Sequence, residues 1–593
     1  MPASNDHPVP DQHGVNLFSS DPELLRLLGV YLPAELLAHL RPRLERLGAL
    51  AGGHLDQLAS TADKHPPTLA HRSRTGLDEQ RIVKHPAFQE MERLAFGEFG
   101  LAAISHRNDV LGWQGPLPPA VKYALTFLFV QAEFGLCCPV SMTDSLARTL
   151  KKFGAAELVE RYLPRLTSLD PDELFQGAMF MTEQGAGSDV AATATVARPD
   201  PDDPDGWLLD GDKWFCSNPD AALAMVLARP ASDLRERSPD RDREIAFMEN
   251  SAFPQATAAA AGRLVAPTRG LSLFLLPRLL EDGTPNRYRI IRLKDKLGTR
   301  SMASGEIRLE GAKAFLVGEP GRGFVQMADM VNNSRLSNGV RAAGLMRRAA
   351  SEAMFIARNR QAFGRRLIDM PLMRRQLLKI LLPGEQARTM MFQTAAALQR
   401  ADAGDNRAYS LARVLTPLIK FRACRDARKV TGDAMEVRGG CGYIEEWPDP
   451  RLLRDAHLGS IWEGTSNIVA LDVVRAIRRE QSLDALQEHW AGLLEDATVD
   501  AELRRLLDDA MPRAVQLAQA AARGEEGLTR QAASALYHLT SAVAMAWEAT
   551  RIGSPHRALL ARLVLQHRVL PRDPLAAQEP PDAAALEHAL LSV

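Results

Sequence analysis

The sequence predicts an α+β protein of several domains: an N-terminal α domain, a central β-barrel or β-sheet domain, a C-terminal four-helix bundle and an extra C-terminal helical region. Two observations lead to this fold class. The chain has 593 residues, which is too long for one compact core. Its apolar residues follow a helical period, then a strand-like texture, then a helical period again.

The N-terminal helical domain is expected over residues 1–174. Pro22-Glu23-Leu24-Leu25 is typical of the first turn of a helix, because proline favours the first helical position. Further along the domain, apolar side chains recur at helical spacings, at Leu146, Leu150, Phe153 and Leu158.

The central β domain is expected over residues 175–318. Short strand-like runs alternate there with Gly, Pro and Asp turn residues, at 206–210, 223–228, 271–276 and 288–293. Within the domain, residues 231–269 carry charges and then a run of small residues without a useful hydrophobic period. We therefore expect a loop insertion there, and we assign it no chemistry.

The bundle domain is expected over residues 319–480, because long helical patterns return at Phe324. The first helix is expected to reach about Gln361, and the second to start at Leu372 with a kink at Pro383. The third is expected from Arg407 to about Val430. A Gly-rich break at 438–442 and a helix at 466–479 follow, and residues 481–593 form the extra helical region.

Composition narrows the classes of function. Lysine and arginine number 72 against 73 acidic residues, so no general attraction to nucleic acid or membrane is expected. The five cysteines have no CxxC or disulfide spacing, and the polar start lacks a signal-peptide pattern, which favours the cytoplasm. The most apolar stretch, near 123–130, is far shorter than the roughly 20 residues that span a bilayer, so no membrane contact is expected.

Several common catalytic motifs are absent from the sequence. There is no Gly-x-x-x-x-Gly-Lys phosphate loop, no His-Glu-x-x-His zinc pair and no Gly-x-Ser-x-Gly nucleophile elbow. The sequence therefore does not favour a nucleotide triphosphatase, a metalloprotease or a hydrolase with a nucleophile elbow. We expect no metal site.

Two segments of the β domain have the composition of ligand-binding loops. Residues 179–189, Met-Phe-Met-Thr-Glu-Gln-Gly-Ala-Gly-Ser-Asp, follow a strand-like run with small residues that let the backbone approach an anionic or ring-shaped ligand. Residues 211–218, Gly-Asp-Lys-Trp-Phe-Cys-Ser-Asn, place two aromatics beside a hydroxyl and an amide. Taken alone, the first is more often a plain turn and the second ordinary core.

A third segment carries the candidate base. Residues 453–467 place Glu463 between Trp462 and Gly464 at the junction of a loop and a helix. A carboxylate among apolar neighbours has its charged form disfavoured, which suits a general base. The alternative interpretation is helix capping by Thr465 or Ser466.

The order and separation of these segments resemble the acyl-CoA dehydrogenase family over about residues 80–480. The two β-domain segments are similar to the family's flavin loop and strand, and four further stretches are similar to its motifs: 296–301, 360–364, 438–443 and 461–465. Within the family, the AidB branch of alkylation-response flavoproteins is the most similar, in residues 138–143, 293–298, 371–374 and 460–464 and in the extra C-terminal region.

The resemblance implies FAD as the cofactor. Thr182 would bond the flavin ring and Ser188 the pyrophosphate, while Phe215 and Ser217 would lie against the ring near N5. The implied cofactor-binding residues are Met179, Met181, Thr182, Gly187, Ser188, Phe215, Ser217, Arg360, Phe363, Glu436, Gly439, Gly440, Trp462, Thr465 and Asn467.

The resemblance also implies an assembly, a substrate and a reaction. Arg360 and the stretch 436–440 would reach FAD from a neighbouring subunit of a homotetramer. Ser188, Arg335 and Gly464 would contact an acyl-CoA thioester. Glu463 would remove the α-proton while the β-hydrogen leaves as hydride to flavin N5, and an electron-transfer flavoprotein or a similar acceptor would reoxidise the flavin.

Three alternatives stay open. The first is an AidB-like, DNA-associated protective flavoprotein with weak dehydrogenase activity. DNA binding is disfavoured, because the chain from Asp484 onward has ten arginines, no lysine and fifteen acidic residues. The second is a flavin oxidase of the nitroalkane type, which would carry aspartate rather than glutamate as its base. The third is a flavin-binding scaffold without catalysis.

Overall fold

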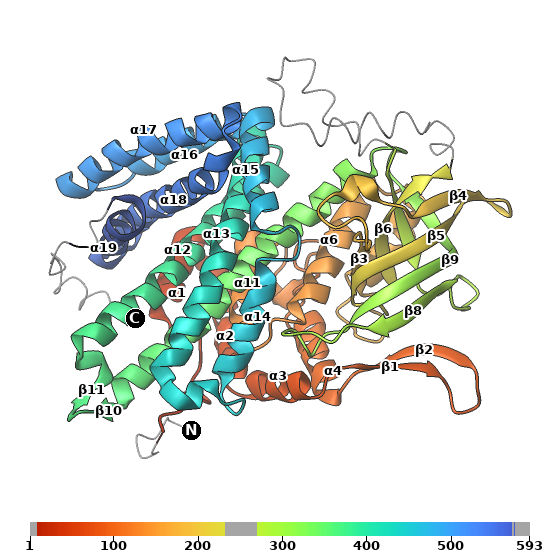
Figure 1. The fold of residues 1–593 in the computed structure, drawn as a ribbon, viewed down its shortest axis with the longest axis horizontal. Helices are drawn as coiled ribbons and strands as arrows, with labels where there is room; N and C mark the ends of the chain where they lie inside the picture. Colours follow the sequence, from red (N-terminus) through yellow and green to blue (C-terminus); the bar gives the residue numbers. More distant parts are fainter. Residues whose placement is uncertain (1–8, 232–269, 572–574, 576–593) are drawn as a thin grey trace.

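The computed structural model of the chain describes residues 9–231, 270–571 and 575. A helical body and a β barrel lie side by side, and four further helices pack on the far side of the body from the barrel (Figure 1). This arrangement confirms the predicted fold class. The predicted insertion at 231–269 lies outside the described residues except for Ala231, and the domain boundaries stay predictions.

The N-terminal part is mainly helical. Its first helix begins at Pro22 as predicted, and the Asp21 carboxylate caps it by accepting a hydrogen bond from Leu24 N. The helices are α1 (Pro22–Tyr31), α2 (Ala34–Gly52), α3 (His54–Lys64), α4 (Pro86–Glu92), α5 (Pro119–Phe129), α6 (Cys137–Phe153) and α7 (Ala156–Leu166).

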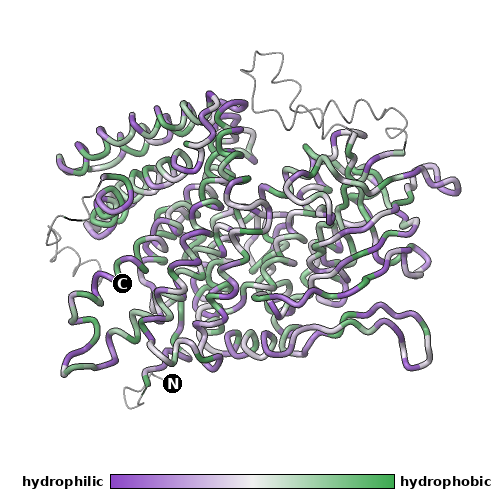
Figure 2. The backbone as a smooth tube through the Cα atoms, in the orientation of Figure 1, coloured by the Kyte–Doolittle hydropathy of each residue, from purple (hydrophilic) through white to green (hydrophobic). Residues whose placement is uncertain are grey.

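A β hairpin interrupts this helical part and was not predicted. Strands β1 (Thr68–Arg72) and β2 (Asp78–Val83) pair antiparallel and extend along the underside of the barrel (Figure 1). Most of their residues are partly or fully exposed, and the hairpin is largely hydrophilic (Figure 2). A pair of strands that buries so little leaves hardly any alternation of apolar and polar residues to detect.

The central domain is a barrel of seven strands: β3 (Gly177–Phe180), β4 (Val196–Asp200), β5 (Asp203–Ser217), β6 (Leu223–Pro230), β7 (Ser272–Pro277), β8 (Tyr288–Leu293) and β9 (Ser304–Val317). The strand order is β3-β6-β4-β5-β9-β7, with β8 on β9. Antiparallel pairing of β6 with β7 closes the sheet on itself. Strands β6 and β7 are buried along their whole length, which explains their unbroken apolar runs.

The bundle consists of α11 (Gly323–Asn359), α12 (Pro371–Asp402), α13 (Asn406–Arg438) and α15 (Ser466–Glu480), and α13 contacts the other three. Helix α12 runs unbroken across Pro383, and the predicted kink there stays a prediction. Helix α13 continues beyond the predicted end near Val430 and stops at Gly439, whose φ of 74° favours glycine. Helix α14 (Pro448–Gly459) was not predicted.

The extra C-terminal region is helical, as predicted, and packs on the bundle. It consists of α16 (Ser482–Glu495), α17 (Ala501–Arg523), α18 (Thr529–Ile552) and α19 (Pro555–Val564). Helix α18 is the central one, because it contacts α1, α12, α13 and α15 as well as its three neighbours (Figure 1). No helix in the described part of the chain is long and apolar enough to cross a membrane.

Candidate active site

Glu463 stands in the turn between α14 and α15. Its backbone lies in the left-handed region, with φ of 48°, and Gly464 follows with φ of 104°. Left-handed backbone is uncommon for a residue with a side chain, and such residues cluster at functional sites. Thr465 stands at the N-cap of α15, but its side chain makes no capping hydrogen bond. Capping by the Thr465 side chain therefore does not explain the conformation of this turn.

The Glu463 carboxylate is held by two buried side chains of α11. Ser334 Oγ donates to Oε1 at 2.9 Å, and Asn338 Nδ2 donates to Oε2. Both donors are fully buried, and the spacing of four residues places them on the same face of the helix. The contacts on the carboxylate are therefore polar, not the apolar neighbours that the sequence suggested.

The backbone of the turn is also fixed. Arg335 Nε donates to the Glu463 carbonyl at 3.0 Å, while its Nη1 pairs with Asp472 at 2.7 Å. Lys420 Nζ donates to the Gly464 carbonyl at 2.8 Å. Burial lowers the pKa of both Arg335 and Lys420, although Asp472 acts against burial at Arg335. Two buried cations thus hold the carbonyls of two consecutive peptide bonds, those that follow Glu463 and Gly464.

Buried hydrogen bonds anchor the loop at 181–192 to the barrel. Glu183 Oε1 accepts hydrogen bonds from Lys213 Nζ at 2.7 Å and from Thr195 Oγ1 at 2.5 Å. Burial acts to raise the pKa of Glu183, but the charge of Lys213 together with the hydrogen bonds from Lys213, Thr195 and Ala194 N outweighs it and holds that pKa below its usual value. Trp214 N donates to the Thr182 carbonyl at 2.9 Å, which ties the loop to β5.

The outer surface of the same loop is open. A Cβ atom added to Gly187 would meet no atom within 4 Å, and Ser188 beside it is exposed. On β5, the Phe215 ring is 58% exposed, which is unusual for a large apolar side chain. Met179 lies in β3 and Met181 directly after it, and both pack against the hydrophobic core. An open loop beside an exposed aromatic ring suits a flat ligand that carries phosphates.

Cys138 links this surface to the candidate base. Burial raises the pKa of its thiol to about 11, a hydrogen bond with Ser217 opposes that rise, and the Glu463 carboxylate is among the charges that act on it. Ser217, at the end of β5, and Glu463 therefore both lie near Cys138. Trp462 stacks on Phe134 with ring centroids 5.8 Å apart, and its buried Nε1 has no hydrogen-bond partner in the described structure.

A second group of predicted residues lies elsewhere. Arg360 Nη1 donates to the Arg438 carbonyl at 3.0 Å, which places it beside Gly439. Phe363 is 95% exposed in the hairpin of β10 (Gln361–Ala362) and β11 (Arg365–Arg366), at the end of the bundle far from the barrel (Figure 1). The remaining members, Glu436 and Gly440, lie at the end of α13 and in the turn after it.

Within one chain, these two groups cannot form one site. Ser334 and Arg360 are 26 residues apart on or just beyond α11, which corresponds to roughly 39 Å along a helix. The predicted residues Thr465 and Asn467 belong to the Glu463 group, and Asn467 faces the C-terminal region, where Arg530 donates to it at 3.5 Å.

Sequence reasoning missed four residues of the Glu463 group: Ser334, Asn338, Arg341 and Lys420. The first three follow one another at intervals of four and three residues, so they share one face of α11. The sequence does contain a signal for them, since polar residues at helical spacing interrupt an otherwise apolar helix face. No comparable signal marks Lys420, which lies on another helix.

The residues present fit FAD. An exposed aromatic ring and a loop of small residues with open surroundings lie on the barrel, and Ser217, two residues from that ring, shares Cys138 as a neighbour with Glu463. The described residues contain no group of three His, Cys, Asp or Glu side chains that could hold a metal ion.

Three family models match consecutive parts of the chain. They are described as the adaptive response protein AidB N-terminal domain, over residues 8–173, the acyl-CoA dehydrogenase middle domain, over 178–312, and the acyl-CoA dehydrogenase C-terminal domain, over 321–478. Acyl-CoA dehydrogenase family member 11 of Caenorhabditis elegans is 30% identical over 85% of this chain and 78% of its own length. Putative acyl-CoA dehydrogenase AidB of Escherichia coli is 31% identical over 84% of this chain and 85% of its own.

Solved structures show the same fold. Caenorhabditis elegans ACDH-11 in complex with C11-CoA superimposes with a TM-score of 0.83 at 26% identity, covering 97% of this chain and 95% of that one. An acyl-CoA dehydrogenase complexed with FAD from Bacillus anthracis has a TM-score of 0.63 at 18% identity, covering 91% and 87%, and shows likeness of fold alone.

Proposed function

Since this chain belongs to the acyl-CoA dehydrogenase family and has an AidB-type N-terminal domain, we propose that it is an FAD-dependent enzyme that oxidises an acyl-CoA thioester, with Glu463 as its base. The observation that carries the proposal is the placement of the Glu463 carboxylate. It is oriented by Ser334 and Asn338 on a left-handed turn, beside the residues that suit a flavin.

In this proposal Glu463 removes the proton from the carbon next to the thioester carbonyl. Bound FAD supplies the acceptor for the hydride that leaves the β-carbon. Because the α-proton is only weakly acidic, the thioester oxygen needs a hydrogen-bond donor, and the main-chain N–H of Glu463 is assigned that role, which is worth about 3 kcal/mol. Arg335 and Lys420 hold the turn, so that the carboxylate and this N–H keep their relative positions.

Thr182, Ser188, Phe215 and Ser217 would hold the cofactor from the barrel side. Arg360 and the stretch 436–440 would hold it from a second copy of the chain, since they lie too far from the first group within one copy. This division of the residues supports an assembly of at least two copies, and we propose a homotetramer. The relative that was solved with C11-CoA supports a thioester as substrate, and an electron-transfer flavoprotein or similar protein is proposed as the electron acceptor.

A glutamine at position 463 tests the proposal. Glu463→Gln keeps the size of the side chain but removes the base, so the purified protein should keep its yellow flavin and lose anaerobic bleaching by acyl-CoA thioesters. General-base catalysis contributes roughly a hundred- to ten-thousand-fold, and the rate should fall by at least the lower figure.

The matched control is Glu446→Gln. Glu446 is exposed and lies just before the start of α14, whereas Glu463 follows the end of that helix. The control variant should bleach like the unmodified protein. Bleaching at the normal rate in Glu463→Gln would remove Glu463 from this role. Absence of bleaching in the unmodified protein with every thioester tried would instead favour a non-catalytic flavoprotein.

A further inference from the structure

Arg341 lies on α11 three residues beyond Asn338, one of the two side chains that bind the Glu463 carboxylate. Ser334, Asn338 and Arg341 share one helix face, and the first two bind the Glu463 carboxylate. Arg341 lies seven residues beyond Ser334, which corresponds to roughly 10 Å along the helix. An acyl chain that passes Glu463 along this face in the C-terminal direction of α11 would have its far end at Arg341.

The Arg341 side chain is fully buried, yet neither of its terminal nitrogens has a hydrogen-bond partner among the described residues. Its Nε donates to the Ser337 carbonyl at 3.3 Å. The guanidinium carbon lies 4.7 Å from the centroid of the Trp462 ring and 5.3 Å from that of Phe134. The contacts of the cation are therefore mainly aromatic, and none is with a carboxylate in the described structure.

The other buried arginines of α11 are neutralised by ion pairs with carboxylates. Arg335 pairs with Asp472 at 2.7 Å, Arg347 with Asp21 at 2.9 Å, and Arg348 with Glu352 at 2.8 Å. A buried cation without a counter-charge costs several kcal/mol, whereas a contact with an aromatic face returns about 2 kcal/mol. Among the described residues, Arg341 is the one of these four that has no anionic partner.

Nearby groups do not supply the missing charge. Burial raises the pKa of the Cys137 thiol to about 12, and it raises those of Cys138 and Cys424 to about 11, so these neighbours of Arg341 stay neutral. The two guanidinium nitrogens of Arg341 that lack partners in the described structure form a pair of donors that suits the two oxygens of a carboxylate.

We propose that Arg341 is a specificity-determining residue that selects acyl-CoA thioesters whose acyl group ends in a carboxylate. The proposal rests on the proposed function, since it needs the thioester to lie at Glu463. Arg341 is enclosed in this structure, so the half-buried Trp462 ring must move aside when the carboxylate arrives. An acyl chain that ends in a methyl group would leave the buried cation unpaired and would bind less tightly.

The test measures binding in the flavin-loaded Glu463→Gln protein, where turnover does not interfere. Glutaryl-CoA, adipyl-CoA and suberyl-CoA are each compared with the unsubstituted acyl-CoA of equal length, and the shift of flavin absorbance gives Kd. In the presence of Arg341, the dicarboxylate thioester of the best-fitting length should bind at least about tenfold more tightly than its partner. Adding Arg341→Met should abolish that preference.

Arg322→Met, at an exposed arginine just before α11, is the matched control and should keep the preference. Equal or tighter binding of the unsubstituted thioesters to the protein with Arg341 would overturn the proposal. So would an unchanged preference in Arg341→Met, or loss of flavin from that variant alone, which would assign the arginine to the cofactor. If the protein with Glu463 bleaches with unsubstituted thioesters only, the proposed function survives and this inference fails.

Discussion

Asp455 shows what burial does to a single carboxyl group near the site. Its Oδ1 accepts a hydrogen bond from Thr299 N at 2.6 Å, between α14 and the loop after β8. Burial raises the pKa of this carboxyl to about 7, the negative charge of Glu133 adds to the rise, and the hydrogen bond from Thr299 opposes it. Asp455 is therefore largely protonated in the folded protein below neutral pH.

The raised pKa predicts how stability depends on pH. In the unfolded chain Asp455 loses its proton near pH 4, whereas in the folded protein it does so near pH 7. Its favourable contribution is fully present below pH 4 and is lost as the pH rises to about 7. Asp455→Asn keeps the oxygen acceptor and removes the titration. The variant should therefore gain stability over the unmodified protein between pH 5 and pH 8, by at most about 4 kcal/mol.

Thermal unfolding of both proteins at pH 5, 6, 7 and 8 checks this prediction. The difference in Tm should grow with pH and level off above pH 7. Asp433→Asn is a suitable control, because Asp433 pairs with the exposed Lys429 on the surface of α13. A Tm difference that is constant across the series would show that Asp455 is ionised throughout.

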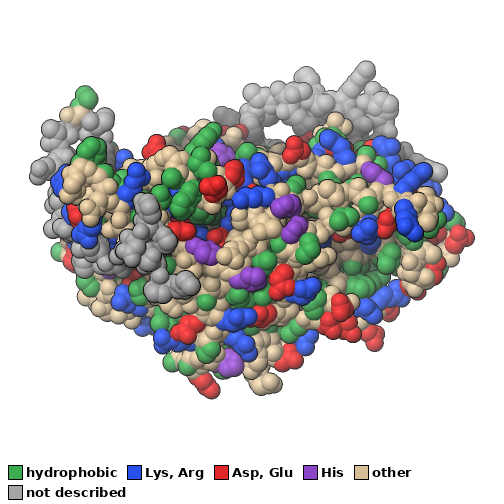
Figure 3. All heavy atoms as spheres, turned by 90° about the horizontal axis from the view of Figure 1, so that it is seen from below, with side chains coloured by type: hydrophobic (Ala, Val, Ile, Leu, Met, Phe, Trp, Pro, Cys, Tyr) green, Lys and Arg blue, Asp and Glu red, His purple; other side chains and the backbone are tan. Residues whose placement is uncertain are grey.

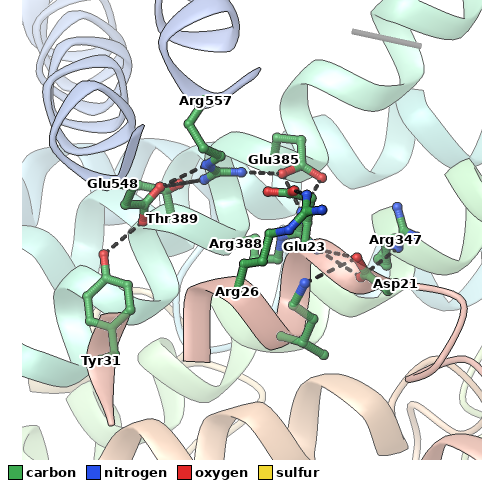
Figure 4. Close-up of polar contacts among 11 residues, drawn as sticks. Asp21, Glu23, Arg26, Tyr31, Arg347, Glu385, Arg388, Thr389, Glu548 and Arg557 are labelled. Atoms are coloured by element: carbon green, nitrogen blue, oxygen red, sulfur yellow. Dashed lines mark hydrogen bonds and ion pairs between the residues drawn. The ribbon is translucent and has the colours of Figure 1, made fainter. Parts of the chain in front are cut away.

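At the scale of elements, a buried ionic network docks the C-terminal helices on the bundle. Arg557 of α19 pairs with Glu548 of α18 at 2.5 Å and with Glu385 of α12 at 2.5 Å (Figure 4). Arg388 forms ion pairs with both Glu385 and Asp21, and Asp21 lies at the start of α1. Every one of these charged side chains is buried. Buried ion pairs thus join the extra C-terminal region to α12 of the bundle and, through Arg388, to the start of α1.

Removal of one member of this network should be costly. Arg557→Met leaves Glu548 and Glu385 as buried carboxylates with fewer partners, and breaking such a pair costs about 3–5 kcal/mol. Chemical denaturation should report this loss, and limited proteolysis should cut α18 and α19 more readily. Arg513→Met, which breaks the exposed pair with Asp509, should cost less than about 1 kcal/mol. Equal effects of the two changes would contradict the role given to the network.

At the scale of the whole molecule, the predicted cofactor residues fall into two groups, one beside Ser334 in the interior of α11 and the other at its C-terminal end. If a neighbouring copy brings the Arg360 group to the Glu463 group, mixed assemblies can repair two inactive variants. Arg360→Met and Glu463→Gln should each be inactive alone. In a mixed assembly, an Arg360→Met copy keeps Glu463 and receives Arg360 from its neighbour, so one complete site forms.

Co-expression of the two variants with different affinity tags and purification of the mixed assembly measures this effect. Acyl-CoA bleaching should return to a clear fraction of the normal rate in the mixed sample. Simple mixing of the separately purified variants is the control, and it should stay inactive if subunits do not exchange. An inactive mixed assembly with full flavin occupancy would show that each chain builds its own site.

The charge distribution of the whole molecule bears on the DNA-associated alternative. Three arginines of the C-terminal region, Arg504, Arg513 and Arg562, pair with carboxylates of the same region, and Arg557 is buried. On the face seen in Figure 3, basic and acidic side chains are interspersed. Duplex phosphates are bound by clustered cations, so these features do not favour DNA binding.

Local chemistry explains how much the sequence determined by itself. Pro22 starts α1, apolar runs mark the strands β5 to β8, and helical periods mark the long helices, because each pattern acts within a few residues. Glu463 was named from the sequence for a different reason, since the order and separation of the segments around it resemble the acyl-CoA dehydrogenase family. The exposed β1–β2 hairpin was not predicted, since it buries little.

Only the tertiary structure decided which distant residues meet. Ser334 reaches Glu463 across 129 residues of sequence, and the Arg341 guanidinium lies over Trp462 from another helix. The packing of α11, α13 and the turn before α15 creates these contacts, and no local pattern encodes it. The same holds for the missing counter-ion of Arg341, because whether a buried charge is paired depends on every element that surrounds it.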